Sequence, residues 1–346
     1  MASRLETLFQ EYQQLGIDQQ LDYDKFYLYS LITHSTAIEG STITEIENQI
    51  LFDHGISLKG KSLIEQSMNL DLKAAYEKAI ELAKAHTAIT VQELIALAAI
   101  VMKNTGSDYS TALGSFSSSR GELRLLNVSA GIGGRSYMSF TKVPLKLGKL
   151  CEDINKTRAN LSNLSISERY AFSFDAHFHL VTIHPWADGN GRMARLLMNL
   201  LQFEADLIPT KIQKADKEDY IKALEATREK DDLSIFRRFM SEMMEKQLER
   251  EIAEFKQSVG EDDGVVVSMN TNKKKLSTKE RILERLQMDN TLTASALAIE
   301  FGLSLGAINK QITLLKREGK LLRIGPPKGG YWEIPSPSRK PWTAVS

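Results

Sequence analysis

Residues 184–195 read H-P-W-A-D-G-N-G-R-M-A-R, and they place an imidazole, a carboxylate, an amide, two glycines and two guanidinium groups within twelve positions. Pro185 requires the preceding helix to end before it, because a residue that precedes proline is displaced from the α region. Helical periodicity resumes over residues 191–205. We therefore expect a loop between two helices, with much of the chain's chemistry in that loop.

The start of the second predicted helix offers groups that bind phosphate. The first N–H groups of a helix have no intrahelical partners and lie at the positive end of its dipole. Gly189 and Gly191 let the backbone approach phosphate oxygens closely, and Asn190 adds an amide donor. Arg192 and Arg195 are three residues apart, so they lie on one side of the helix and can hold different phosphates.

Two further groups complete the inventory that a nucleoside triphosphate requires. Asp188 supplies a carboxylate that can hold Mg²⁺ between phosphates. His184 supplies an imidazole that can take a proton from an attacking hydroxyl. Asp-Gly-Asn-Gly alone is a common turn, and an isolated His-Pro carries no information. Their conjunction at a helix start nevertheless favours a functional site.

This stretch closely resembles the signature of the Fic family, H-P-F-x-D-G-N-G-R-x-x-R. Every named position matches except the aromatic one, which is Trp186 in place of phenylalanine, and we expect the larger ring to pack inward. Fic proteins mostly transfer AMP from ATP to a Ser, Thr or Tyr hydroxyl of another protein and release pyrophosphate. The resemblance implies a mainly α Fic core within residues 30–255, with ATP and Mg²⁺ as its ligands.

The resemblance also assigns individual roles. His184 becomes the general base and Asp188 the Mg²⁺ ligand. The anion hole and phosphate ligands are Gly189, Asn190, Gly191, Arg192 and Arg195, of which Arg195 holds the γ-phosphate. Tyr220 corresponds to a tyrosine that the family commonly places against the base or ribose, and a simple core or surface tyrosine is the alternative.

Residues 35–40, S-T-A-I-E-G, resemble the family's inhibitory motif, S/T-x-x-x-E-G/N. Ser35 and Glu39 are four residues apart and so share one face of a helix, and Gly40 completes the motif. The resemblance implies that Glu39 pairs with Arg195 and competes with the γ-phosphate. Without the signature downstream, this spacing would indicate only a solvated face or a local cap.

A β-hairpin is predicted before the signature. Residues 122–128 can be extended, and residues 136–143 alternate like a second strand that Pro144 ends. The pair resembles the family's flap, which aligns an extended target segment by strand addition. The expected target contacts are Tyr137, Met138 and Ser139. An ordinary structural hairpin is the alternative.

The chain divides into parts of different composition. The domains expected are an N-terminal helical region with the inhibitory motif at 1–110, the Fic core at 111–256, a polar linker at 257–275, a winged helix-turn-helix at 276–334 and a tail at 335–346. The winged helix is predicted from helices over 278–288, 294–300 and 305–318 and strands over 321–324 and 331–334.

Charge is unevenly distributed although the formal net charge is zero. Residues 273–346 carry 14 Lys and Arg against 6 Asp and Glu, whereas the preceding 272 residues carry 30 against 38. This balance suggests that the two parts have different partners, and it leaves both DNA and protein open for residues 276–334. The polar side chains expected to reach DNA are Asn309, Lys310, Thr313, Lys316, Arg317 and Lys328.

Composition also limits the compartment and the metal chemistry. Cys151 is a single cysteine, so a reducing cytoplasm is the natural location. No apolar run approaches the roughly 18 residues that a membrane span needs, so no membrane partner is expected. His177 and His179 are two apart on a helix and face different directions, which favours structural roles over a metal site. The sequence leaves a homodimer open.

Three functions follow from these observations. The first is a protein adenylyltransferase that Glu39 inhibits, with another protein or the chain itself as target. The second is a transcription regulator whose core senses a nucleotide. The third is a hydrolase that removes AMP from modified proteins, with Glu39 positioning water. The first is favoured because the complete signature supplies both a base and a triphosphate site.

Overall fold

The computed structural model describes residues 3–20, 22–129, 136–260, 278–301, 303, 305–324 and 331–335. The chain forms two compact units. The first comprises Met1–Asp18 and Asp24–Ala253, and the second comprises Gln19–Tyr23 and Glu254–Ser346. Helices dominate both units, and the strands form small two-stranded sheets, so the predicted mainly α class is confirmed.

The N-terminal part of the first unit is helical, as predicted. Its elements are α1 (Arg4–Gln14), η1 (Ile17–Gln19), α2 (Tyr23–Ile38), α3 (Glu45–His54), α4 (Leu63–Lys84) and α5 (Val91–Val101). Capping boxes at Ser3, Thr44 and Ser62 start α1, α3 and α4 by satisfying backbone N–H groups that the helix leaves free. Thr90 caps α5 by accepting from the Glu93 N–H.

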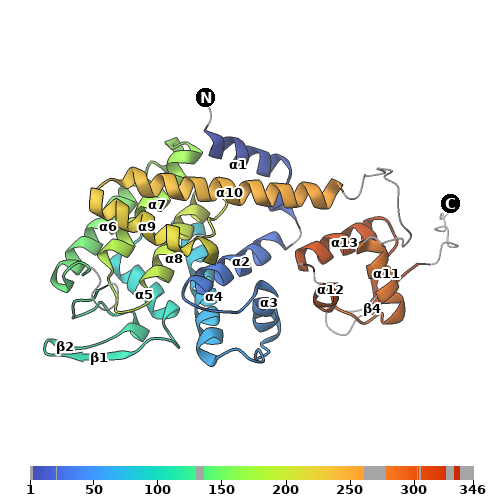
Figure 1. The fold of residues 1–346 in the computed structure, drawn as a ribbon, viewed down its shortest axis with the longest axis horizontal. Helices are drawn as coiled ribbons and strands as arrows, with labels where there is room; N and C mark the ends of the chain where they lie inside the picture. The colour runs from blue at the N-terminus through green and yellow to red at the C-terminus, as the bar shows by residue number, and fades with distance from the viewer. Residues whose placement is uncertain are drawn as a thin grey trace, which may run out of the picture. The chain divides into compact units, whose positions relative to one another are not determined.

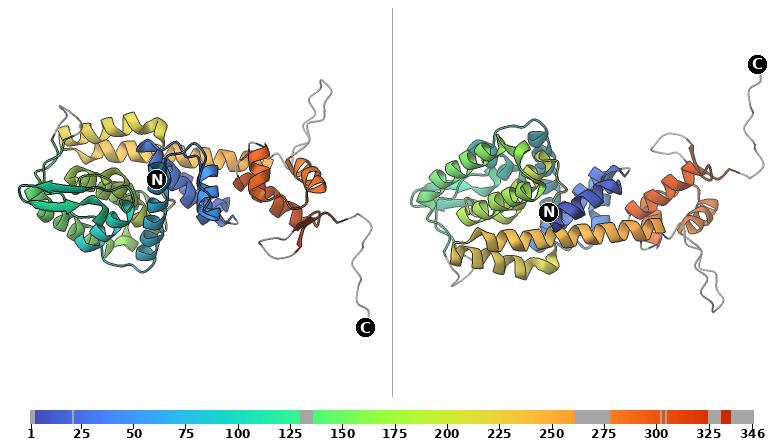
Figure 2. Two further views of the ribbon diagram at one scale, coloured as in Figure 1. Left: turned by 90° about the horizontal axis from the view of Figure 1, so that it is seen from below. Right: turned by 90° about the horizontal axis from the view of Figure 1, so that it is seen from above.

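The rest of the first unit surrounds one buried helix. Its helical elements are η2 (Ser118–Arg120), η3 (Phe140–Lys142), α6 (Val143–Arg158), η4 (Leu161–Asn163), α7 (Ile166–Ile183), α8 (Asn190–Glu204), η5 (Lys214–Asp216), α9 (Lys217–Lys230) and the first part of α10 (Leu233–Gly260). From Glu254 onward, α10 belongs to the second unit. Helix α8 packs most extensively against α7 and α4, and Figures 1 and 2 show it inside the bundle. Because α8 is buried on nearly every side, its N-terminus is held rigidly.

The two helices that flank the signature nearly match their predicted bounds. Helix α7 ends at Ile183, before Pro185, as predicted. Its N-cap is Ser165, which forms a capping box with Glu168. Helix α8 begins at Asn190, one residue before the predicted start.

The predicted hairpin is wrong in its bounds. Residues 122–128 form no strand, and Ser129 and Ser136 form only an isolated bridge. Residues 140–142 form a 3-10 turn, and Pro144 lies in the first turn of α6, where its missing N–H removes no helical hydrogen bond. The two-stranded sheet of this unit is instead β1 (Asp108–Thr111) paired antiparallel with β2 (Gly114–Ser117).

The second unit follows the predicted element order. It contains α11 (Thr278–Met288), α12 (Ala294–Phe301), α13 (Leu305–Arg317), β3 (Leu322–Ile324) and β4 (Tyr331–Glu333), with β3 and β4 antiparallel. Its apolar core includes Ile282, Leu297, Ile308 and Leu315. The predicted linker begins later than expected, because α10 continues to Gly260. Residues 261–275, Lys328 and residues 336–346 of the predicted tail lie outside the described residues.

No helix in the described ranges combines the length and the apolar character that crossing a membrane would require.

Candidate active site

The signature forms the predicted loop between two helices. His184 is the C-cap of α7 in a left-handed conformation (φ 54°), and its N–H donates to the carbonyl of Leu180 at 3.0 Å. Gly189 is the N-cap of α8 and is also left-handed (φ 80°), a conformation that glycine adopts without strain. The left-handed conformations of these two residues turn the chain so that the imidazole lies near the positive end of α8.

The tautomer of His184 is set by its backbone neighbour. Nδ1 lies 3.3 Å from the carbonyl oxygen of Val181. A carbonyl can only accept, so Nδ1 carries the hydrogen and Nε2 is left as the proton acceptor. Burial lowers the pKa of His184 to about 4, and the charges of Arg124 and Arg228 lower it further against the opposing Val181 contact. The ring is therefore neutral near pH 7 and can act as a base.

A pocket of about 330 Å³ opens beside this imidazole. Its wall contains the inhibitory motif, the signature and α9. The lining residues are Ile38, Glu39, Tyr137, Val181, His184, Ala187, Asp188, Gly189, Asn190, Gly191, Arg195, Lys217, Tyr220, Ile221, Leu224, Glu225 and Arg228. Segments far apart in the sequence thus meet at one cavity.

The two glycines of the signature are required by close neighbours. A Cβ on Gly191 would lie 2.8 Å from Oε1 of Glu39 and 3.1 Å from Nη1 of Arg195. A Cβ on Gly189 would lie 2.6 Å from Sδ of Met102. The backbone at the start of α8 is consequently bare toward the pocket, which suits a phosphate group.

Asn190 and Trp186 hold the loop in shape. The Asn190 side chain accepts from the Trp186 N–H at 3.1 Å and donates to the Trp186 carbonyl at 2.9 Å. The Trp186 ring is buried, as predicted, and its Nε1–H donates to the carbonyl of Gly121 at 2.8 Å. The Asn190 amide therefore supports the loop through Trp186.

Asp188 and Arg192 differ in their access to the pocket. The Asp188 carboxylate is 61% exposed; Oδ1 accepts from the Gly189 N–H at 2.6 Å, and Oδ2 lies 3.7 Å from Nη2 of Arg192. The Arg192 guanidinium turns toward α5, with Nη2 3.0 Å from Sδ of Met102 and Nη1 3.4 Å from Oγ1 of Thr105. Arg192 does not line the pocket.

The contact expected between Glu39 and Arg195 is present. Nη2 of Arg195 lies 2.5 Å from Oε1 of Glu39, and Nε donates to Oγ of Ser35 at 2.8 Å. Burial alone would raise the pKa of Glu39, but the charge and hydrogen bond of Arg195 outweigh it and lower that pKa. Burial likewise opposes the charge on Arg195, and Glu39 overcomes it and raises the Arg195 pKa. Both groups are charged at neutral pH.

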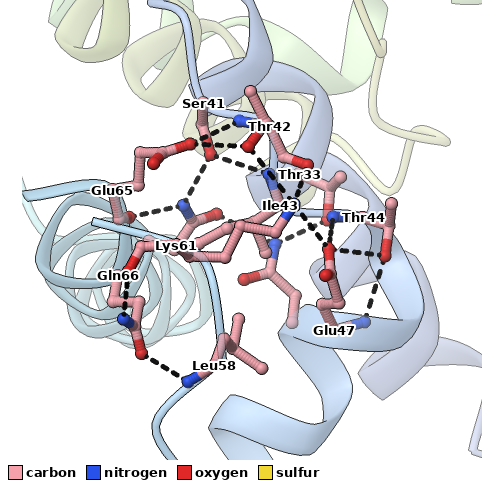
Figure 3. Close-up of polar contacts among 12 residues, drawn as sticks. Thr33, Ser41, Thr42, Ile43, Thr44, Glu47, Leu58, Lys61, Glu65 and Gln66 are labelled. Carbon is pink, nitrogen blue, oxygen red and sulfur yellow. Dashed lines mark hydrogen bonds and ion pairs between the residues drawn. The ribbon is translucent and has the colours of Figure 1, made fainter. Parts of the chain in front are cut away.

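A polar network binds the loop that follows Glu39 to α4 (Figure 3). The N–H and Oγ1 of Thr42 donate to Oε1 of Glu65 at 2.8 and 2.9 Å. Nζ of Lys61 donates to the Thr42 carbonyl at 2.7 Å and forms an ion pair with Glu47 at 3.1 Å. The chain just beyond Glu39 is therefore fixed at several points.

Asn69 of α4 connects both sides of Glu39. Its Oδ1 accepts from Oγ1 of Thr36 and from Nδ2 of Asn48, each at 2.9 Å, and its Nδ2 donates to Oγ of Ser41 at 3.2 Å. Asn48 and Asn69 are fully buried. This cluster could not be predicted from the sequence, because its members lie on separate elements and none belongs to a local motif.

The predicted flap residues are only partly at the pocket. Tyr137 stacks on His184 with ring centroids 3.7 Å apart and planes 17° apart. Met138 lines a different pocket, of about 380 Å³, between α6 and α7. Ser139 lines neither pocket, and its Oγ lies 3.0 Å from Oγ1 of Thr141.

Tyr220 lines the pocket from α9, although it is almost wholly buried. Its hydroxyl lies 2.9 Å from Nε2 of His177. Burial lowers the pKa of His177 to about 3, with smaller contributions from Arg195 and Arg228. His177 is therefore a neutral core histidine that orients Tyr220, whereas His179 lines the pocket between α6 and α7.

Three basic residues at or beside the site were not predicted from the sequence. Lys217 donates to the carbonyl of Ile38 at 2.7 Å, at the end of α2. Arg228 lies over the ring of Tyr137, 5.7 Å from its centroid. Arg124 is buried and donates from Nε to the carbonyl of His184 at 2.8 Å. None belongs to a recognisable spacing, so no local signal could have identified them.

Comparison with known proteins identifies the class. Residues 88–202 match the model of the Fic/DOC family, and this range contains the whole signature. Protein adenylyltransferase fic-1 of Caenorhabditis elegans is 27% identical over 272 residues, which cover 77% of this chain and 48% of that protein. Protein adenylyltransferase Fic of Drosophila erecta is 30% identical over 222 residues, which cover 63% of this chain and 40% of that protein.

Solved structures share the fold. A Fic domain containing signaling protein from Bacteroides thetaiotaomicron has a TM-score of 0.61 at 21% identity, covering 74% of this chain and 97% of that one. A Fic family protein from Desulfovibrio desulfuricans has a TM-score of 0.58 at 18% identity and covers 98% of both chains. Residues 88–202 of the chain therefore match the domain of the Fic/DOC family. It spans about half or less of the length of the curated relatives named above.

Proposed function

We propose that this chain is a protein adenylyltransferase, which transfers AMP from ATP to a Ser, Thr or Tyr hydroxyl of a protein. The names of its curated relatives support this activity. The observation that carries it is the shared pocket of His184, Arg195 and the start of α8. A base, a cation and helix N–H groups at one cavity are what transfer of a nucleotidyl group requires.

The reaction follows from the positions of these groups. Nε2 of His184 takes the proton of the target hydroxyl, and the hydroxyl oxygen attacks the α-phosphorus of ATP. The bond from that phosphorus to the bridging oxygen breaks, and pyrophosphate leaves. The N–H groups at the start of α8, beside Gly189 and Gly191, stabilise the charge on the phosphates. Asn190 contributes by fixing the loop through Trp186.

Asp188 is the residue that would hold Mg²⁺. Its exposed carboxylate lines the pocket, and Mg²⁺ is commonly bound by one or two carboxylates together with substrate phosphates. No cluster of three or more His, Cys, Asp or Glu side chains within the described ranges could hold an ion by itself. When bound, the ion would neutralise phosphate charge.

Glu39 is proposed as an inhibitor of ATP binding. Its carboxylate forms an ion pair with the guanidinium of Arg195, which is the proposed γ-phosphate ligand. A phosphate and this carboxylate would compete for the same donors. Ser35 holds the Arg195 guanidinium in place, and Gly40, with φ 106°, follows Glu39 in the turn after α2.

The remaining roles concern the target and the nucleoside. Tyr137, Met138 and Ser139 are proposed to contact the target segment, and Tyr220 the base or ribose. Arg192 is proposed as a second phosphate ligand, which requires its guanidinium to turn away from Met102 toward the pocket. The target is a protein, with the chain itself included.

Replacing Glu39 in the full-length chain tests this proposal. We expect Glu39→Gly to increase the labelling of proteins in a cell lysate by α-³²P-ATP, and the double variant Glu39→Gly with His184→Ala to abolish it. If Glu39→Gly binds Mg-ATP but labels nothing, including itself, the transferase proposal is wrong. The hydrolase would instead be indicated if the unaltered chain releases AMP from labelled protein and the Glu39→Gly variant does not.

We also propose that residues 278–335 form a winged helix-turn-helix. Three helices followed by an antiparallel strand pair support it. Nζ of Lys310 donates to Oγ of Ser258 at 2.8 Å and lies 4.5 Å from the Phe255 ring, so this cation is already bound at the end of α10. An experimental structure in which β3 and β4 fail to pair beside α13 would overturn this proposal.

A further inference from the structure

Arg124 is a buried guanidinium that lies between the flap segment and the signature loop. Its side chain is 1% exposed. Nε donates to the carbonyl of His184 at 2.8 Å, Nη1 donates to the carbonyl of Leu126 at 2.7 Å, and Nη2 donates to the carbonyl of Met138. Its own backbone N–H donates to the carbonyl of Pro185 at 3.1 Å.

These contacts join three stretches of backbone that are distant in sequence. Leu126 lies before the Ser129–Ser136 bridge and Met138 lies after it, so Arg124 holds both arms of this segment. The contact with His184 attaches the same guanidinium to the proposed base. The planar guanidinium, with five donors in a fixed fork, suits three separate carbonyls better than an ammonium group does.

The charge of Arg124 lacks the usual compensation. Within the described part of the chain, no carboxylate forms an ion pair with it, and burial lowers its pKa. A buried cation normally requires a charged partner or full hydrogen bonding, and here three carbonyl dipoles supply the latter. Burying a cation in this way costs more free energy than packing alone would justify.

We propose that Arg124 is a positioning residue for the transfer reaction, which holds the His184 base and the flap segment in one fixed geometry. The inference rests on the proposed function. The position of Tyr137 also depends on Arg124, because Tyr137 directly precedes Met138 and its ring stacks on His184. Removing the fork would therefore loosen the flap and the base together, without touching the proposed phosphate ligands.

The charge of Arg124 has a second effect, on the protonation of His184. After burial, Arg124 and Arg228 are the charges that lower the His184 pKa. The other ionisable groups around the same pocket are Glu39 from the turn after α2, Tyr137 from the flap segment, Asp188 and Arg195 from the signature, and Lys217, Tyr220 and Glu225 from α9. A variant that keeps the charge and one that loses it should separate the two effects.

The test uses the full-length Glu39→Gly protein with Arg124→Lys or Arg124→Gln added. We expect kcat to fall about 100-fold in both, because small misplacement of a catalytic group has effects of that size, while KM for ATP changes less than about 2-fold. Amide hydrogen exchange at Tyr137 should accelerate in both. The His184 ring pKa, measured by NMR, should rise in Arg124→Gln and stay low in Arg124→Lys.

Arg169 provides a matched control. Its guanidinium also donates to three carbonyls, those of Leu164, Ala205 and Ser162, but it lies outside the pocket. Arg169→Gln should leave Tyr137 exchange and kcat unchanged. If Arg124→Lys and Arg124→Gln change kcat and Tyr137 exchange no more than Arg169→Gln does, the positioning role is wrong.

The experiment also separates this inference from the proposed function. Exchange and NMR report on Arg124 even if the Glu39→Gly parent transfers no AMP, and unchanged values there would overturn the inference alone. If Arg124→Gln does not fold, Arg124→Lys carries the test, because it keeps the charge and removes the fork. Normal Tyr137 exchange in a folded Arg124→Lys protein would then contradict the proposal.

Discussion

His184 combines a left-handed backbone with a ring whose tautomer is set by Val181. Both features come from the end of α7, where Pro185 prevents the helix from continuing. A histidine with φ above zero is uncommon, and such conformations cluster at functional sites. The strain at this residue therefore accompanies the chemistry that we propose for it.

Burial of His184 predicts a pH dependence of stability. Its pKa falls from 6.5 to about 4 on folding, so between these values the unfolded chain binds the additional proton and acid destabilises the fold. Between about pH 7 and pH 4.5 the free energy of unfolding of the parent chain falls. We expect this fall to be about 2–3 kcal/mol smaller in His184→Asn. Asparagine is chosen because it tolerates the left-handed region.

Urea denaturation at the two pH values measures this effect, and His54→Asn, at an exposed histidine, is the control. The attribution to His184 fails if both variants lose stability in acid as steeply as the parent chain.

Gly191 predicts a direct effect on nucleotide binding. A methyl group there would meet the position that Glu39 now occupies, which is where we place a phosphate. In the Glu39→Gly background we expect Gly191→Ala to weaken Mg-ATP binding by at least about 10-fold, equivalent to about 1.4 kcal/mol, in calorimetric titration.

Gly148→Ala is the matched control for this substitution. Gly148 lies in α6 with nothing within 4 Å of the added carbon. Removing a helical glycine should stabilise the fold by about 0.5–1 kcal/mol and leave ATP affinity unchanged. Equal ATP affinity in the two alanine variants would contradict the proposed phosphate position.

At the scale of elements, α4 restrains the end of α2 through Asn69. Asn69→Ala would remove one hydrogen bond each from the buried side chains of Thr36 and Asn48, which keep their bonds to Thr33, and should reduce the free energy of unfolding by about 1–3 kcal/mol. We also expect it to release Glu39 and increase Mg-ATP binding in the otherwise unaltered chain. In the Glu39→Gly background the same substitution should have no further effect on binding.

This double-mutant comparison distinguishes release of Glu39 from general loosening. Asn155→Ala is a suitable control, because Asn155 also binds a backbone, that of Ile89, but far from Glu39. An equal gain in ATP binding from Asn155→Ala, or from Asn69→Ala after Glu39 has been removed, would count against a role of α4 in inhibition.

The flanking helices of the signature were predictable because their limits are encoded locally. Pro185 ends α7, and the glycines precede α8. The resemblance of residues 35–40 to the family's inhibitory motif also identified the carboxylate that contacts Arg195. The hairpin was misplaced because residues 136–143 alternate but pair only at the isolated Ser129–Ser136 bridge, and the proline expected to end a strand instead lies in the first turn of α6. Alternation alone does not establish a partner strand.

At the scale of the whole molecule, the two units have separate apolar cores. The element order of the second unit was predicted because its helices are short, amphipathic and separated by turns. Arg124 and Asn69 could not be predicted, because each acts through partners brought together only by the tertiary fold. Polar groups of this kind have no periodicity in the sequence.

Separate cores predict separate responses to the nucleotide. In the Glu39→Gly chain, Mg-ATP at about 100 times its Kd should stabilise the unit that contains the pocket by about 2.7 kcal/mol. Differential scanning calorimetry of the full chain should show this transition moving upward, while the transition of the second unit stays in place. A common upward shift of both transitions would show that the units unfold as one.

The indole beneath the signature loop offers a practical consequence. Phenylalanine, the usual aromatic at this position in the family, has no N–H for the Gly121 carbonyl, whereas Trp186 donates to it from a buried site. The chain has three tryptophans, and the other two are Trp332 and Trp342. Replacing those two with phenylalanine would leave Trp186 as the single tryptophan, whose emission on excitation at a wavelength that tyrosine does not absorb would follow the arrival of a nucleotide in real time without any added label.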